Sequence, residues 1–154
     1  MGATAQGSGL YIRKHNLSNI RIDAPTSYVA KYYEESEILV KTSIFEGFGL
    51  VLTEAMSRGC VPIAFDSFKS VHDIVETGRN GMLIKPYKVH EYANGLYRLV
   101  QNDPQLKLMS TAAQETIKKF DIESIGNQWI KLFIELYEDR ICNKFCQSSS
   151  DTPG

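Results

Sequence analysis

The stretch SIFEGFGLVLTEAMSRGCVP, residues 43–62, combines a glycine-rich turn with a helical pattern that follows it directly. Gly47 and Gly49 allow the backbone to turn sharply and to approach a ligand closely. The apolar run at residues 38–40 predicts a strand before the turn, and residues 49–58 predict a helix after it. The order strand, loop, helix is typical of a parallel βαβ unit.

The pattern of strand followed by helix continues along the chain. The predicted strands are 19–23, 38–40, 61–65 and 82–84, and the predicted helices are 10–16, 26–36, 49–58, 71–76, 90–101, 104–120 and 123–140. About four strands alternating with helices indicate an α/β fold, with a parallel sheet covered on both faces. In the last helix we expect the stripe of Ile125, Trp129, Leu132 and Leu136 to be core.

Length and composition favour one folded domain. The chain has 154 residues, of which 43% are hydrophobic and 23% charged, close to the averages for folded soluble proteins. A net charge of -1 offers no basic field for nucleic acid, which we exclude as a partner. We expect a flexible leader at residues 1–9, the domain at residues 10–141 and a disordered tail at residues 142–154.

The cysteine and hydropathy patterns predict a cytoplasmic protein. The three cysteines form no paired framework, and Cys60 lies at the start of a predicted buried strand, which suits a reducing compartment. No run approaches the roughly 20 apolar residues that cross a bilayer, and the N-terminus lacks the layout of a secretory signal. Any membrane contact is therefore expected to be peripheral, on the inner face of the plasma membrane.

Two acids lie on either side of the predicted helix start. Glu46 lies in the loop, and Glu54 lies about 7–8 Å along the helix, at about 1.5 Å per residue. A helix start offers unpaired N–H groups to an anion, and open α/β sheets bind ligands at the carboxyl ends of their strands. Carboxylates accept hydrogen bonds from sugar hydroxyls. The arrangement predicts a site for a diphosphate flanked by hydroxylated rings, which describes a nucleotide sugar.

These residues also carry a family resemblance. The segment EGFGLVLTE at residues 46–54, followed by AMSRGCVPIA, resembles the retaining glycosyltransferases of family 4. The resemblance extends over residues 19–137 and includes AFD at 64–66 and GRNG at 78–81. It implies a GT-B enzyme, built from two Rossmann-like domains with the active site between them. This chain would be most of the C-terminal, donor-binding half, truncated at its N-terminus.

The resemblance implies roles for single residues. Glu46 would contact the hydroxyls of the donor sugar and is the candidate catalytic residue, and Glu54 would bind the ribose hydroxyls. Thr53 would lie beside the phosphate or the ribose. The backbone facing the donor sugar and the diphosphate would come from Gly47, Phe48, Gly49 and Leu50. The segment whose backbone faces the nucleobase would be Ile22, Asp23 and Ala24, without the glycine that is common there.

The implied reaction moves a sugar from a nucleotide sugar, preferably a UDP-sugar, to a glycan or lipid-linked acceptor of a surface polysaccharide. The anomeric configuration would be retained. We expect no cofactor and no metal, because His15, His72 and His90 lack the spacing of metal ligands. The acceptor-binding half and the segment whose Arg and Lys neutralise the diphosphate have no counterpart here. We therefore expect donor binding with little or no transfer by this chain alone.

Other interpretations stay open. A non-catalytic nucleotide or nucleotide-sugar binding module would use the same half-site. A dinucleotide-binding domain is disfavoured because no G-x-G-x-x-G follows a first strand. Away from the loop, His72 is expected to form a solvated pair beside Asp73, and Lys69 to be an exposed lysine. The family resemblance also allows the last helix, with its apolar stripe, to pack toward the acceptor-binding half instead of into the core of this domain.

Overall fold

The structure is a computed structural model that describes residues 5–148, with side chains described for residues 8–140. The described strands form one three-stranded parallel sheet in the order β1 (Ile38–Lys41), β2 (Val61–Phe65), β3 (Met82–Ile84). The register pairs Val40 with Ile63 and Ile63 with Met82. β2 is therefore the central strand, and all of its residues are buried.

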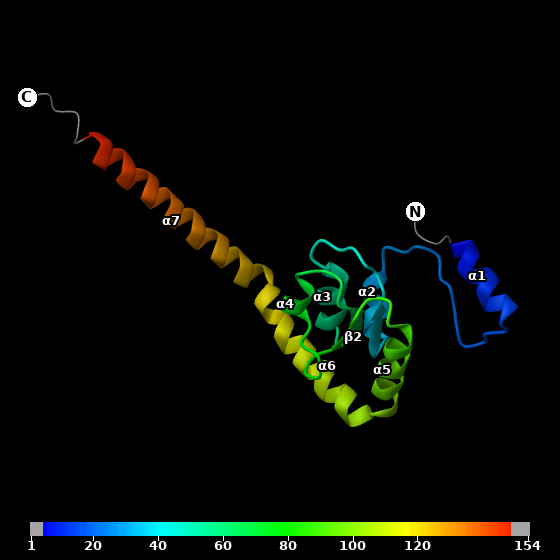
Figure 1. The fold of residues 1–154 in the computed structure, drawn as a ribbon. Coiled ribbons are helices and arrows are strands. Elements are labelled where there is room, and N and C mark those ends of the chain that lie inside the picture. Colours follow the sequence, from blue (N-terminus) through cyan, green and yellow to red (C-terminus); the bar gives the residue numbers. More distant parts are fainter. Residues whose placement is uncertain (1–4, 149–154) are drawn as a thin grey trace, which may run out of the picture.

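Helices cover both faces of this sheet (Figure 1). In chain order they are α1 (Ala5–Lys14), α2 (Val29–Glu34), α3 (Leu50–Ser57), α4 (Val71–Ile74), α5 (Val89–Gln101), α6 (Asp103–Ile117), the 3-10 helix η1 (Lys118–Phe120) and α7 (Ile122–Ser148). Residues of α3 and α4 pack on one face, residues of α5 pack on the other, and α6 contributes to both. The predicted α/β fold with a covered parallel sheet is confirmed.

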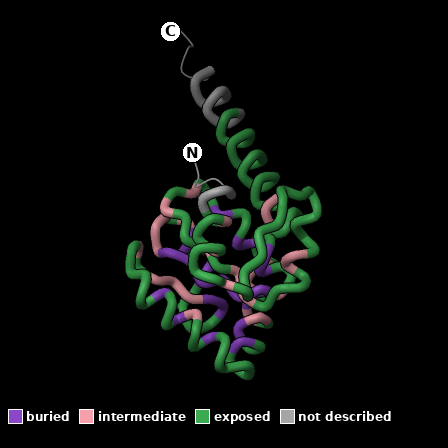
Figure 2. Tube along the Cα trace, turned by 90° about the vertical axis from the view of Figure 1, so that its right-hand side faces the viewer, coloured by how far each residue is buried: buried purple, intermediate pink, exposed green. Residues whose placement is uncertain are grey.

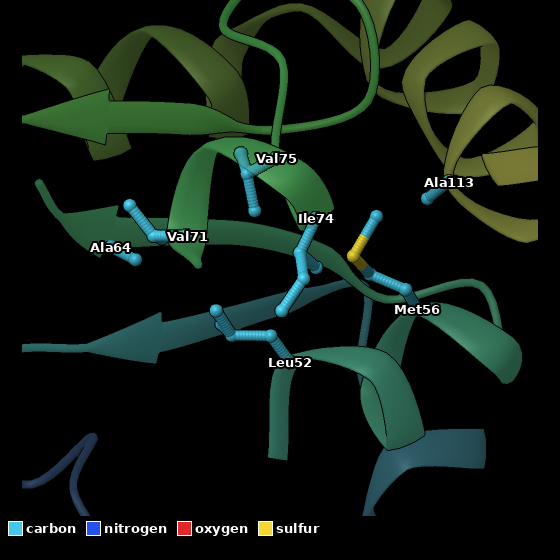
Figure 3. Close-up of a cluster of buried hydrophobic side chains, with 7 residues drawn as sticks. All are labelled: Leu52, Met56, Ala64, Val71, Ile74, Val75 and Ala113. Atoms are coloured by element: carbon cyan, nitrogen blue, oxygen red, sulfur yellow. The ribbon is translucent and has the colours of Figure 1, made fainter. Parts of the chain in front are cut away.

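The two faces of β2 belong to two hydrophobic clusters. Ala64 lies in the first cluster with Leu52 and Met56 of α3 (Figure 3). Ile63 and Phe65 point the other way and lie in the second cluster, among side chains of α5 and α6. Side chains alternate along a strand, so a central strand with both faces covered must be apolar throughout.

The strand predicted at residues 19–23 does not form. The chain between α1 and α2 is irregular, and Ile20 and Ile22 are exposed. A strand satisfies its backbone N–H and C=O groups only beside another strand, and here the apolar alternation of the segment finds none. β1 is therefore an edge of the described sheet. The other predicted strands and helices are present with shifted ends, and the helix expected at residues 104–120 ends in η1.

Helix α7 projects away from the rest of the molecule (Figure 1), and its described side chains are mostly exposed (Figure 2). The prediction that its apolar stripe is core is wrong: Trp129 is 55% exposed, and Leu132 and Leu136 are exposed as well. The stripe lacks a covering surface because the main contact of α7 among the described elements is η1. An apolar period identifies the face that a helix would bury, but it does not supply the partner.

Helices extend into both segments that flank the expected domain. Helix α1 includes residues 5–9, which we expected as a leader, and α7 includes residues 142–148 of the expected tail. Residues 1–4 and 149–154 lie outside the described residues. The division into leader, domain and tail stays a prediction.

Candidate functional site

The candidate site lies at the carboxyl ends of the parallel strands, where two loops are joined by hydrogen bonds. The first loop connects β1 to α3, and the second connects β2 to α4. Ser67 Oγ of the second loop donates to the Ser43 carbonyl at 2.9 Å. Ser70 Oγ lies 3.1 Å from the Gly47 carbonyl and 3.2 Å from the Phe48 carbonyl. The second loop thus holds the backbone of the glycine turn through its carbonyl groups.

Gly49 starts helix α3 in a conformation that suits glycine. Its φ of 91° places it in the left-handed region, where a side chain is strained. A Cβ at this position would also lie 3.0 Å from two ring atoms of Phe68. No described side chain caps the helix start. The first amides of α3 are therefore without a side-chain cap and could donate to an anion.

Glu46 lies in the loop before this helix start and is held by a lysine. Its Oε1 forms an ion pair with Lys41 Nζ, whose side chain is only 10% exposed. The Glu46 side chain is 27% exposed, so the carboxylate stays partly open to solvent. An ion pair that is partly shielded from water is stronger than one on the open surface. Glu46 is thus an ordered carboxylate at the edge of the sheet.

Glu54 lies on α3, on the side that faces α2. Its Oε2 is 3.5 Å from the hydroxyl of Tyr33, a long hydrogen bond. Burial raises the pKa of Tyr33, and the charge of Glu54 raises it further, so the phenol stays protonated and donates. A shallow hollow beside Glu54 is lined from α2 by Ala30 and Tyr33 and from α3 by Ser57. This hollow is open to hydroxyl groups of a ligand.

A second hollow of about 690 Å³ lies on the other side of Glu54. Phe48, Leu50 and Phe120 give it an apolar wall. The rings of Phe48 and Phe120 meet edge to face, with centroids 5.4 Å apart, so η1 supports the loop. Thr53 also lines this hollow, but its hydroxyl donates to the Leu50 carbonyl at 2.8 Å. The Thr53 hydroxyl can therefore accept a hydrogen bond from a ligand, but it cannot donate one.

The structure brings the loop and helix residues together, whereas no hydrogen bond or ion pair among the described residues joins the predicted nucleobase segment to them. Ile22, Asp23 and Ala24 are all exposed, in the irregular chain before α2. Asp23 pairs with Arg21 at 3.0 Å instead of with any group of the site. Because the predicted strand has no neighbour, nothing fixes this segment against Glu54.

Sequence reasoning missed several supporting residues. The hydroxyls of Ser67 and Ser70 connect the two loops, and the two serines in the segment DSFKS after the central strand were the only signal for them. Lys41 was missed although it lies at the end of a predicted strand, five residues before Glu46. The predicted partner of His72 was wrong: His72 Nε2 pairs with Asp66 Oδ1 at 2.8 Å.

That correction follows from the fold. Asp66 directly follows the central strand, and the short helix α4 brings His72 back to it, so the pair forms between residues six positions apart. Lys69 is exposed, as expected.

No three His, Cys, Asp or Glu side chains gather into a metal-binding group within the described part of the chain. Over the same part, no helix combines the length and the apolar content needed to cross a membrane. The chemistry of the candidate site therefore rests on two carboxylates, one lysine, hydroxyl groups and free amides at a helix start.

Comparison with known proteins assigns the fold and this loop to one family. The family described as glycosyl transferases group 1 matches residues 12–116. The chain is 33% identical over 116 residues to a poly(ribitol-phosphate) alpha-N-acetylglucosaminyltransferase of Staphylococcus aureus. That match covers 75% of this chain and 24% of the relative. The chain belongs to the group 1 glycosyl transferases, and it spans about a quarter of the length of this relative.

Solved structures agree with this assignment. A TarM mutant of S. aureus in complex with fondaparinux, alpha-GlcNAc-glycerol and UDP is 31% identical, with a TM-score of 0.78 over 85% of this chain and 27% of that one. The pneumococcal O-GlcNAc transferase GtfA, in complex with UDP and GlcNAc, is 25% identical with a TM-score of 0.75 over 88% and 28%. The fold is that of the Rossmann-like C-terminal domain of GT-B enzymes, present in part.

Proposed function

We propose that this chain is the donor-binding domain of a retaining family 4 glycosyltransferase. The enzyme would move a hexose-type sugar from a UDP-sugar to a glycan or lipid-linked acceptor during the synthesis of a surface polysaccharide such as capsule or lipopolysaccharide. The observation that carries the proposal is the uncapped start of α3 with a carboxylate on either side, Glu46 in the loop and Glu54 on the helix.

Each part of the donor has a counterpart in this arrangement. The diphosphate lies at the start of α3, where the amides and the helix dipole favour negative charge. The ribose hydroxyls donate to Glu54, next to Tyr33, and the donor sugar hydroxyls donate to Glu46. UDP as the nucleotide is supported by its presence in the TarM and GtfA complexes, and an N-acetylglucosaminyl donor by the activity for which the S. aureus relative is named.

The chemistry of this half is electrostatic. As the bond between sugar and diphosphate breaks, negative charge grows on the leaving diphosphate, and the amides at the start of α3 stabilise that charge. Glu46 holds the donor sugar in the orientation for transfer and does not act as the nucleophile. The helix start supplies only part of the positive charge that the leaving group requires. The proposed mechanism uses no metal ion and no cofactor.

The acceptor belongs to a part of the enzyme beyond this chain, because the chain spans about a quarter of the length of its relatives. Donor and acceptor must be held together for an efficient transfer. This chain alone is therefore expected to bind the donor and to transfer little. The intact enzyme would work in the cytoplasm, with peripheral contact to the membrane that holds a lipid-linked acceptor.

Calorimetric titration with UDP, UMP and ADP tests the proposal. UDP should bind more tightly than UMP, because the second phosphate reaches the start of α3, and more tightly than ADP. Glu54→Ala should weaken UDP binding about tenfold, because one charged acceptor of the ribose is lost. Asp103→Ala at the start of α6 removes an acid that lies with Ser36 and Glu37, before β1 and so at the opposite edge of the sheet, and this variant should bind UDP like the parent. Equal UDP affinity in the two variants would contradict the ribose assignment.

A further inference from the structure

Lys41 is the last residue of β1 and reaches from the sheet into the loop of the candidate site. Its Nζ forms the ion pair with Glu46 and lies 3.3 Å from Ser43 Oγ. At 10% exposure its side chain is the most shielded partner of any ion pair among the described residues. Removing the partner of such a shielded lysine leaves an uncompensated charge, which destabilises the folded protein.

The backbone of Lys41 is itself anchored from the other side of the sheet. The hydroxyl of Tyr92 on α5 accepts from the Lys41 N–H at 3.0 Å and lies within hydrogen-bond reach of the carbonyls of Lys41 and Ile63. Tyr92 is 6% exposed, and its ring packs edge to face with Phe65. Tyr92 thus ties the end of β1 to the middle of β2, where the Lys41 side chain leaves the sheet.

Glu46 has no comparable anchor of its own. It lies in a loop between the exposed Phe45 and the exposed Gly47, and a Cβ at Gly47 would meet no atom within 4 Å. Only Oε1 accepts a hydrogen bond from the described residues, and this bond comes from Lys41. Oε2 therefore remains an acceptor for a ligand. A carboxylate that is already ordered binds a hydroxyl at a lower entropic cost than a free one.

From these contacts we propose that Lys41 is a positioning residue, which holds the Glu46 carboxylate at the edge of the sheet with one oxygen directed to the donor sugar. Tyr92 of α5 in turn holds the backbone of Lys41 at the end of β1. The inference rests on the proposed function for the identity of the ligand. The competing role for Lys41 is direct contact with the diphosphate, since it is a cation at the same edge of the sheet.

Binding of UDP and of UDP-sugars separates these two roles. The 154-residue chain is titrated with UDP, UDP-glucose and UDP-N-acetylglucosamine, as parent, Lys41→Met and Lys41→Arg. If Lys41 positions Glu46, Lys41→Met lowers the affinity for the preferred UDP-sugar about tenfold more than the affinity for UDP, and Lys41→Arg restores most of the difference. Lys107→Met breaks an exposed ion pair with Asp103 on α6 and should change neither affinity.

A double-mutant cycle tests the support without any ligand. Urea unfolding is measured for the parent, Lys41→Met, Glu46→Gln and the double variant. If Lys41 holds Glu46, the double variant loses less stability than the sum of the two single losses, because the pair can be broken only once. Additive losses would overturn the inference.

The two measurements also distinguish a failure of the Lys41 inference from a failure of the proposed function. Equal weakening of UDP and UDP-sugar by Lys41→Met would overturn positioning in favour of diphosphate contact. No effect on any ligand would also overturn it. If the parent binds neither UDP nor a UDP-sugar, the proposed function fails, and the cycle alone then decides whether Lys41 holds Glu46.

Discussion

Gly49 faces the ring of Phe68, so closely that a Cβ at residue 49 would lie 3.0 Å from Cε2 and Cζ of that ring. The two residues come from neighbouring loops at the carboxyl ends of β1 and β2. Their contact and the positive φ of Gly49 make the start of α3 a position for glycine. The shape of the candidate diphosphate site thus depends on both loops.

Gly49→Ala should lower the free energy of unfolding by about 1–3 kcal/mol, because it adds backbone strain and a clash with Phe68. UDP affinity should fall with it, as the first amides of α3 move. The matched control is Gly47→Ala: Gly47 has no positive φ, and its Cβ would meet no atom within 4 Å. Urea unfolding of both variants checks this. Equal destabilisation would refute the special role of Gly49.

Ser70→Ala should weaken UDP binding several-fold, because the glycine turn loses the hydroxyl beside the Gly47 and Phe48 carbonyls. The loss of stability should be about 1 kcal/mol, the usual net value of one hydrogen bond. Thr111→Ala removes a comparable exposed hydroxyl contact, on α6, and serves as the control. Calorimetry should find UDP affinity reduced in Ser70→Ala alone. An unchanged affinity would show that the turn keeps its shape without the second loop.

The alkaline stability of the fold should depend on Tyr92. Burial raises the pKa of Tyr92 from its ordinary value of 10.0 to about 12, against the opposing effect of the Lys41 N–H bond. Because the pKa is raised in the folded state, the stabilising contribution is fully present below pH 10. It is lost as the pH rises towards 12. The contribution is on the order of 2–3 kcal/mol, at about 1.4 kcal/mol per pKa unit.

Tyr92→Phe should accordingly be less stable than the parent at about pH 9 but should lose less between about pH 9 and pH 11. Burial also raises the pKa of Tyr33 and of the Cys60 thiol, so the comparison of the two proteins isolates Tyr92. Urea unfolding at both pH values gives the result. Parallel losses in the parent and the variant would mean that Tyr92 titrates normally.

Trp129 is the one tryptophan of the chain and reports on helix α7. With 55% of the residue exposed, its fluorescence should be quenched by acrylamide nearly as strongly in the folded chain as in urea. Glu123, near the start of the same helix, offers a control variant, Glu123→Gln, which should leave quenching unchanged. Strong protection of Trp129 in the dilute folded chain would contradict the exposed position of α7.

Period and turn chemistry were enough to predict most of the fold. The apolar run of β2 and the helical period of α3 are local signals, and the glycine turn between β1 and α3 has its own signature. The failures are non-local. Whether residues 19–23 form a strand depends on a neighbour, and whether Trp129 is buried depends on a covering surface. Neither the neighbouring strand nor the covering surface can be inferred from the residues of the segment itself.

The same distinction holds for the candidate site. Glu46, Gly49 and Glu54 could be proposed from the sequence because they lie in one contiguous segment. Lys41 and Tyr92 were missed because their roles arise from packing: 51 residues separate them along the chain, and the register of the sheet brings them together. Supporting residues of this kind become visible only when the strand ends are placed.

The central claim is that the start of α3 binds the diphosphate of a nucleotide sugar, and amide chemical shifts measure this most directly. On addition of UDP to the 15N-labelled chain, the amides of Gly49, Leu50 and Val51 should shift in a saturable manner and by more than those in the last turn of α5. UMP should produce smaller shifts at the same amides. Saturable shifts that avoid the start of α3, or no shifts at millimolar UDP, would contradict the account.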